Sequence, residues 1–369
     1  MNVRHFVASN RLIDPVKVEG QPDQYWYQCD ENSAADAATR FMRCGRYVDN
    51  NGVISAPVFF APGNEDNDYL TAITEYQANG SSLEMMQTLF SELEAEHKDL
   101  VIFNFGYQNR LSREYEQLKY VHDKYIMAPH GNLGRVLMIT WPSQGFGEYD
   151  AETGNPNFFQ RTFSRLLPGK NVQKDKKEIE FDTKTTGEAL AVFLLKLSSF
   201  INERYKNAGP GQYKPKIQFI AQSMANRILM YCFERLDAMN RMEEISGLFA
   251  NLMLTAADIE NTIFDNDAFR KGMCVATNAY IVCSEDDNIL KLADQFHAIE
   301  GATRLGIKGP ADASKLPANV SVINIRQSTH NIIPFDYNHR YFAYNQVVVD
   351  KYIDLFNGNA FGRNYYLSA

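Results

Sequence analysis

One stretch of the sequence decides the fold: Ile217-Gln218-Phe219-Ile220-Ala221-Gln222-Ser223-Met224-Ala225-Asn226-Arg227. An apolar strand ends in it, and a helix opens directly after Ser223. Alanine stands two positions before and two positions after the serine, where the usual pattern has glycine, and small residues there permit a tight strand-to-helix turn. Such a turn presents the Ser223 hydroxyl, beside helical N–H groups that favour negative charge, as a candidate nucleophile. The alternative is a serine that only caps the helix.

Around this stretch, short apolar runs alternate with amphipathic segments. The pattern predicts strands at 100–105, 135–141, 217–221, 248–255, 278–284 and 320–325. It predicts helices at 111–127, 186–206, 224–236, 287–297 and 345–356. Strands that alternate with helices indicate an α/β fold, with a mostly parallel central sheet and helices on both faces. Ligands bind such sheets at the carboxyl ends of the strands.

Two segments depart from this alternation. Residues 1–99 are predicted to form an N-terminal extension that packs on the core of residues 100–369. Residues 1–66 are mostly strand and turn, with a hairpin at Asn50-Asn51-Gly52, and residues 68–98 are helical. Residues 144–185 are polar and rich in Gly, Lys and Asp, and they form either a surface excursion or a lid over the site.

Composition excludes several classes of protein. The net charge of -8 and the lack of a Lys/Arg block argue against nucleic-acid binding. The five cysteines contain no C-x-x-C pair, so we expect neither a disulfide framework nor a zinc knuckle. We expect instead a reducing, cytoplasmic location. The longest aliphatic run, 189–195, is too short to span a bilayer, and the first residues lack a signal peptide's apolar segment.

A nucleophilic serine needs a base, and the base needs an orienting acid. On sheets with this kind of turn the chain order is serine, then acid, then histidine. Asp287 follows the strand at 278–284, and His339 follows the last strand, so both fit that order. His330 also follows the last strand and is the rival base, while Asp286 and Asp258 are rival acids. The remaining histidines are expected at the surface: His5, His97, His122, His130 and His297.

An oxyanion hole needs two N–H groups that are already in place. The residue after the nucleophile, Met224, is expected to supply one of them. Gly106 or Tyr107, in the loop after the strand at 100–105, is expected to supply the other. The alternative is an ordinary turn that ends the strand.

These blocks together resemble the alpha/beta-hydrolase superfamily, and within it a bacterial family of largely uncharacterised serine hydrolases. The likeness covers about residues 100–356. It is carried by Phe103 to Gln108, Trp141 to Gly145, Ala221 to Arg227, Ala256 to Glu260, Ser284 to Leu290 and His339 to Phe342. The chain departs from the family's pattern at Phe105, Gln108, Gln222, Ala225, Glu260 and Ile289.

The resemblance implies a triad of Ser223, Asp287 and His339, with Asp258 as a structural or supporting acid and Gln222 as a further supporting residue. The expected function is a serine hydrolase, esterase- or lipase-like, acting on a small-molecule or lipid-like acyl substrate without cofactor or metal. No H-E-x-x-H or similar cluster occurs in the sequence. The alternative is a binding or scaffold protein that keeps the fold without turnover. The sequence predicts no oligomeric state.

Overall fold

A computed structural model shows how the chain folds. It describes residues 5–11, 14–17, 24–28, 38–50, 53–60, 78, 80–106, 117–142, 172–297, 302–326, 338–359 and 364–368. Tyr107 and His330 lie outside these ranges, as do residues 143–171.

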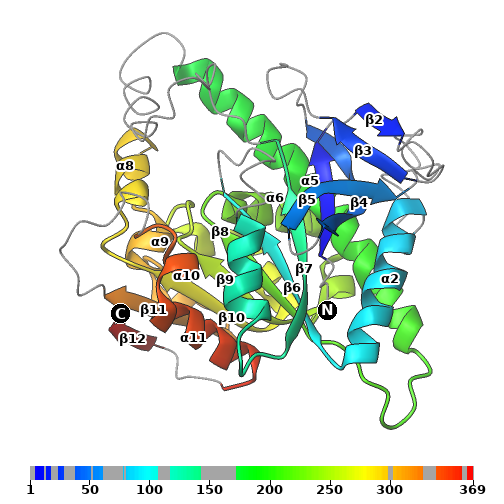
Figure 1. Cartoon of the computed structure of the whole chain (residues 1–369). Coiled ribbons are helices and arrows are strands. Elements are labelled where there is room, and N and C mark those ends of the chain that lie inside the picture. The colour runs from blue at the N-terminus through cyan, green and yellow to red at the C-terminus, as the bar shows by residue number, and fades with distance from the viewer. Residues whose placement is uncertain are drawn as a thin grey trace.

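A single twelve-stranded sheet runs through the molecule in the order β12-β11-β10-β9-β8-β6-β7-β1-β4-β5-β3-β2 (Figure 1). From β12 to β1 every neighbouring pair is parallel, and from β1 to β2 every pair is antiparallel. The strands of the parallel part are β6 (Asp99–Asn104), β7 (Leu133–Thr140), β8 (Ile217–Gln222), β9 (Phe249–Thr255), β10 (Ala276–Cys283), β11 (Val320–Arg326) and β12 (Asn364–Ser368). The N-terminal strands are β1 (Phe6–Arg11), β2 (Asp14–Lys17), β3 (Gln24–Gln28), β4 (Ala38–Asn50) and β5 (Val53–Phe60).

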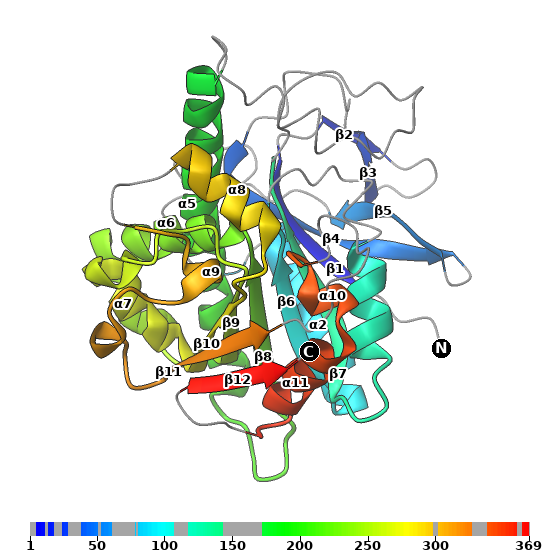
Figure 2. The same cartoon turned by 90° about the vertical axis from the view of Figure 1, so that its left-hand side faces the viewer.

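The helices cover both faces of this sheet (Figure 2). On one face they are α2 (Gly80–Glu96), α5 (Val172–Tyr205), α6 (Ala225–Ala238) and α7 (Asp267–Gly272). On the other they are the π-helical turn η2 (His122–Ile126), α10 (Tyr341–Tyr344) and α11 (Gln346–Phe356). Near the carboxyl ends of β9 and β10 lie α8 (Asn288–His297) and α9 (Leu305–Lys308). The predicted α/β class is confirmed.

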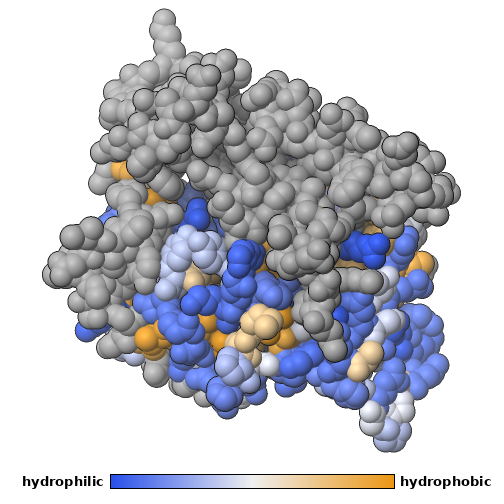
Figure 3. All heavy atoms as spheres, in the orientation of Figure 1, coloured by the Kyte–Doolittle hydropathy of each residue, from blue (hydrophilic) through white to orange (hydrophobic). Residues whose placement is uncertain are grey.

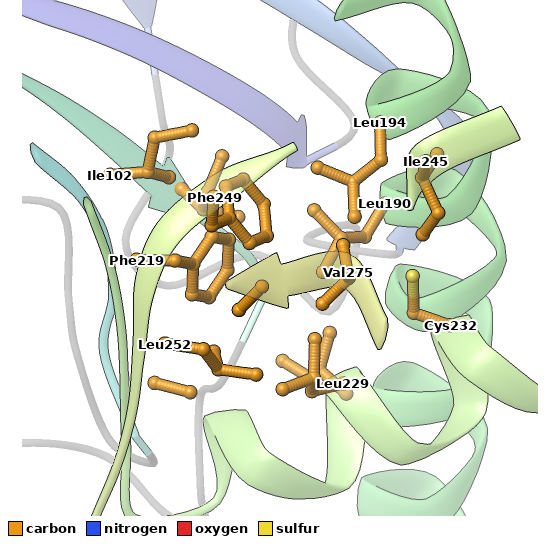
Figure 4. Close-up of a cluster of buried hydrophobic side chains, with 14 of the residues drawn as sticks. Ile102, Leu190, Leu194, Phe219, Leu229, Cys232, Ile245, Phe249, Leu252 and Val275 are labelled. Carbon is orange, nitrogen blue, oxygen red and sulfur yellow. The ribbon is translucent and has the colours of Figure 1, made fainter. Parts of the chain in front are cut away.

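The central strands β6, β7 and β8 are buried along their whole length on both faces of the sheet. In β8, Phe219 points into the core under α5 and α6, while Ile220 belongs to the core on the opposite face. Phe219 packs on Phe249 of β9 with ring centroids 4.9 Å apart, close to Leu190 and Leu194 of α5 (Figure 4). Burial on both faces explains why these strands show unbroken apolar runs and no alternation.

The N-terminal segment extends the sheet. β1 lies parallel to β7, pairing Phe6 with Leu137, and antiparallel to β4 on its other side. The predicted hairpin is present, since β4 and β5 pair directly across Asn50 and Val53. The described N-terminal strands thus continue the plane of the core sheet, and helix α2 covers it at this end.

Helix α5 differs from its prediction, because it begins at Val172 and was expected only from residue 186. Residues 172–185, taken as part of a polar excursion, are therefore helical. This part of the sequence carries Lys and Glu, which are good helix formers, but few apolar residues to show a helical period. Figure 1 shows the first turns of α5 reaching beyond the neighbouring helices, where no apolar stripe is needed.

His5 also corrects a prediction, because it is buried and was expected at the surface. Its ring is 2% exposed, Nδ1 accepts the Val136 N–H at 3.2 Å, and Nε2 lies 2.8 Å from His122 Nδ1. Burial, with the nearby His122 and Arg135, lowers the pKa of His5 to about 3. No local sequence pattern predicts that the His5 ring is buried, because β1 reaches its neighbour β7 only through the tertiary fold.

The outer surface of the described part is mainly polar. Figure 3 shows hydrophilic residues dominating the coloured area of one face, with hydrophobic ones in small patches. Large apolar side chains that are exposed come from separate elements: Tyr120, Met127, Phe181, Val347 and Tyr366. Among the described residues, none of the helices combines the length and the apolar character needed to cross a membrane.

Candidate active site

Ser223 occupies a strained turn between β8 and α6. Its φ is 56°, the left-handed region, which costs a residue with a side chain about 1–2 kcal/mol. The turn is held on both sides: the Ser223 N–H donates to Thr255 O at 2.9 Å, and the Ser223 carbonyl accepts from the Asn226 side chain at 2.9 Å and from the Asp258 N–H at 3.2 Å. Strain that the surroundings enforce in this way is typical of functional positions.

The first N–H groups of α6 lie beside this turn. Met224 directly precedes the helix with φ -65° and ψ -17°. Within the described part of the chain, its N–H donates to no protein acceptor, as expected for the first turn of a helix. The Met224 N–H is therefore available to donate to a bound ligand, as the predicted role of an oxyanion donor requires.

Gly106 lies in the loop after β6 and approaches Ser223 very closely. A Cβ built on Gly106 would lie 2.5 Å from Ser223 Cβ and 3.0 Å from Ser223 Oγ, so only glycine fits there. Its N–H donates to Gln222 Oε1 at 3.0 Å. Gly106 thus lies against the candidate nucleophile, and its N–H donates to Gln222. The other candidate oxyanion donor, Tyr107, lies outside the described residues.

Aromatic residues fix the backbone that leads into Gly106. The Trp141 Nε1–H donates to the Phe105 carbonyl at 2.9 Å, and the Phe105 ring stacks on Phe103 with centroids 4.1 Å apart. Phe105 stands where the family's pattern has a histidine, and it is buried. Its ring supports the loop from beneath and presents no polar group to a ligand.

Asp287 and His339 form a buried pair. His339 Nδ1 lies 2.8 Å from Asp287 Oδ2, and the Asp287 side chain is wholly buried. Asp287 Oδ1 accepts the Leu290 N–H at 2.9 Å, so the same carboxylate also caps helix α8. With Nδ1 donating to a carboxylate, neutral His339 carries its free lone pair on Nε2, as a general base requires.

The two parts of the site lie at one edge of the sheet. Tyr341, two positions after His339, accepts the Ala256 N–H at 2.7 Å and donates to Val282 O at 2.8 Å. These are the carboxyl ends of β9 and β10, and the Ser223 N–H is bonded to Thr255 at the end of β9. Between these described residues, Ser223 and His339 share no hydrogen bond.

In a comparison with known families, residues 82–356 match the family described as "Alpha/beta hydrolase of unknown function (DUF900)". The chain belongs to this family. Comparison with curated proteins gave no match. The match starts within α2 and ends with α11, so it covers the parallel part of the sheet from β6 to β11.

In this alpha/beta hydrolase the carboxylate of the rival acid Asp258 faces another group, because its Oδ1 lies 3.2 Å from Arg304 Nε. The backbone carbonyl of Asp286 accepts the Asn338 side chain at 3.2 Å. Of the three acids considered, the structure pairs Asp287 with His339. The Gln222 side chain accepts the Gly106 N–H, and the Asp258 N–H donates to the Ser223 carbonyl. The rival base His330 lies outside the described residues.

Sequence reasoning missed three residues that hold the alpha/beta-hydrolase site together. Asn226 and Tyr341 stand inside motifs that were quoted, but their bonding roles depend on strands far away in sequence. Arg304 had no signal, because an isolated arginine in a connecting segment looks like a surface residue. Among the described residues, no cluster of His, Cys, Asp or Glu is arranged to hold a metal ion.

Proposed function

We propose that the protein is a serine hydrolase that cleaves a carboxylic ester, thioester or amide through Ser223, His339 and Asp287. The observation that carries this proposal is the buried Asp287–His339 pair, at the same edge of the sheet as the strained turn of Ser223. That combination supplies an oriented imidazole and a serine hydroxyl in the chain order of this fold.

In the proposed reaction His339 Nε2 accepts the Ser223 proton as Oγ attacks the acyl carbon. The tetrahedral oxyanion is held by the Met224 N–H and by a second donor from the loop after β6. Collapse expels the alcohol, thiol or amine, which takes the proton from His339. Water then adds to the acyl-enzyme with His339 again as base, releasing the acid and restoring Ser223.

An esterase- or lipase-like substrate is favoured over a peptide by analogy with other uses of this fold. A small-molecule or lipid-like acyl group is therefore the substrate class to test first. A panel of p-nitrophenyl esters from short to long acyl chains, with Ser223→Ala as the blank, measures the preferred chain length.

A second candidate is a binding or scaffold protein that retains the fold. It is favoured by the Gly106 N–H, which donates to Gln222 and not into the site, and by the lack of a hydrogen bond between Ser223 and His339 in the described structure. In this case the site around Ser223 and His339 would bind a ligand without chemical turnover.

A fluorophosphonate probe separates the two candidates. The serine-hydrolase proposal predicts covalent labelling of the wild type and of Ser246→Ala, a variant of an exposed serine far from the site, and none of Ser223→Ala. Folded wild-type protein that takes no label, or a Ser223→Ala variant that is labelled equally well, would exclude Ser223 as the nucleophile.

A further inference from the structure

Arg304 is an unusual residue, because its charged side chain is only 1% exposed. It faces three carboxylates: Glu260 Oε1 lies 2.8 Å from its NH1, while Asp258 Oδ1 and Asp294 Oδ1 lie 3.2 and 3.9 Å from its Nε. A buried guanidinium is costly unless its partners are well placed, and removing one partner leaves an uncompensated charge. The positions of the segments that carry these groups are therefore tightly coupled.

On one side this cluster reaches the nucleophile turn. The Asp258 N–H donates to the Ser223 carbonyl at 3.2 Å, and Arg227 of α6 donates through Nε to the Asp258 carbonyl at 2.9 Å. Arg227 NH2 also lies 3.6 Å from Glu260. The loop after β9 is thus bonded to the turn of Ser223 through the Asp258 N–H and to Arg304 through the Glu260 carboxylate. Asp258 Oδ1 lies at ion-pair distance from Arg304 Nε without a hydrogen bond between them.

On the other side the segment of Arg304 reaches the acid. The Gly306 N–H donates to Ala257 O at 3.0 Å, and the Gly306 carbonyl accepts the Ser284 N–H at 2.9 Å. The Asp287 N–H donates in turn to Ser284 O at 3.2 Å. A Cβ on Gly306 would lie 2.3 Å from Ala257 N, so this residue fills the space between the two loops completely.

We propose that Arg304 is a positioning residue, which sets the separation between the turn that holds Ser223 and the loop that carries Asp287, the partner of His339. This inference rests on the proposed serine-hydrolase function. The reason is geometric: a hydroxyl and a base react only at hydrogen-bonding distance, and a displacement of about 1 Å costs on the order of 100-fold in rate. Arg304 touches none of the three proposed reacting groups and acts through the loops between them.

The test compares Arg304→Gln with Arg135→Gln. Arg135 is a matched control, because its side chain is 5% exposed and pairs with Glu92 and Glu96 at 2.9 and 2.6 Å, near the amino end of β7. Both variants lose a buried ion pair, so both are expected to melt at a lower temperature. At a temperature where both are folded, Arg304→Gln should lower the rate constant of fluorophosphonate inactivation by roughly 10- to 100-fold without changing the inhibition constant KI. Arg135→Gln should change neither.

A second measurement does not depend on catalysis. Amide hydrogen exchange should accelerate at Asp258 and Ser284 in Arg304→Gln, because the Asp258 N–H donates to the Ser223 turn and the Ser284 N–H donates to the segment of Arg304. Exchange at both residues should stay unchanged in Arg135→Gln. If the wild type takes no label, the hydrolase proposal falls and the exchange data still decide whether Arg304 couples the loops. If Arg304→Gln does not fold, Arg304→Lys replaces it in both measurements. Unchanged exchange and an unchanged inactivation rate in a folded Arg304 variant would overturn the inference.

Discussion

Asp287 binds the imidazole of His339 with one carboxylate oxygen and the N-terminus of α8 with the other. The two bonds are 2.8 Å to His339 Nδ1 and 2.9 Å to the Leu290 N–H. The same carboxylate therefore contacts the imidazole and caps the helix. Because α8 fixes the carboxylate, the imidazole is oriented by a group that cannot swing away.

This double role predicts the behaviour of Asp287→Asn. Asparagine caps helices as well as aspartate, so the free energy of unfolding should change little. With its amide facing His339, asparagine favours the wrong imidazole tautomer, and the labelling rate should fall by about 10,000-fold. Fluorophosphonate kinetics and urea unfolding measure the two effects. Asp286→Asn is the control, and equal losses in both variants would refute the assignment of Asp287.

The contact between Gly106 and Ser223 gives a second prediction. Gly106→Ala places a methyl group 2.5 Å from Ser223 Cβ, so the turn or the β6 loop must move. Overpacking of this kind costs about 1–3 kcal/mol of stability, and labelling of Ser223 should be strongly reduced. Gly209→Ala is the matched control, because its added Cβ meets no atom within 4 Å. A Gly106→Ala variant with wild-type stability and labelling would show that the loop is not held against Ser223.

The left-handed backbone of Ser223 can be measured directly. Glycine adopts a φ of 56° without the penalty that a Cβ brings. Ser223→Gly should therefore be more stable than Ser223→Ala by about 1 kcal/mol, although both lack the hydroxyl and neither should be labelled. Denaturant unfolding of the two variants provides the comparison. Equal stabilities would indicate that the turn relaxes once the hydroxyl is gone.

His5 predicts a pH dependence of stability. The pKa of His5 in the folded protein is lowered to about 3, below the ordinary histidine pKa of 6.5 that holds in the unfolded chain. The unfolded state therefore binds a proton more readily than the folded state. The stability contributed by neutral His5 is complete above pH 6.5 and is lost as the pH falls towards 3, at up to about 1.4 kcal/mol per pH unit. His5→Gln should remove that slope from the unfolding free energy, whereas His97→Gln, a change at an exposed histidine, should leave it. Parallel slopes in wild type and His5→Gln would contradict the burial of a neutral ring.

The parallel half of the fold was predictable because its signals are local. The strands β6 to β11 are runs of apolar residues broken by turns, and the serine turn shows its small residues in the sequence itself. The antiparallel half was less accessible, because β1 is ordered by pairing with β7, more than a hundred residues away in sequence. His5 was misplaced for the same reason, since its partners Val136 and His122 lie beyond the reach of any local pattern.

At the site, chain order made Asp287 and His339 candidates, the family resemblance implied them over their rivals, and neither showed how the loops are held. Asp258 and Asp287 both follow strands and both could cap helices, so only the fold separates the acid that meets an imidazole from the acid that meets Arg304. The acceptor of the Gly106 N–H was equally hidden, because Gln222 approaches it from a neighbouring strand.

The position of β1 has a consequence for biosynthesis. This strand is synthesised before the other described strands, yet it forms the seam between the parallel and antiparallel halves of the sheet, and its parallel neighbour β7 is translated much later. Until then the nascent chain can pair β1 only with β4, which leaves the other edge of β1 open to any strand nearby. Joining the two halves is thus a late event in folding, and the period before it is when a chaperone protects this protein most effectively.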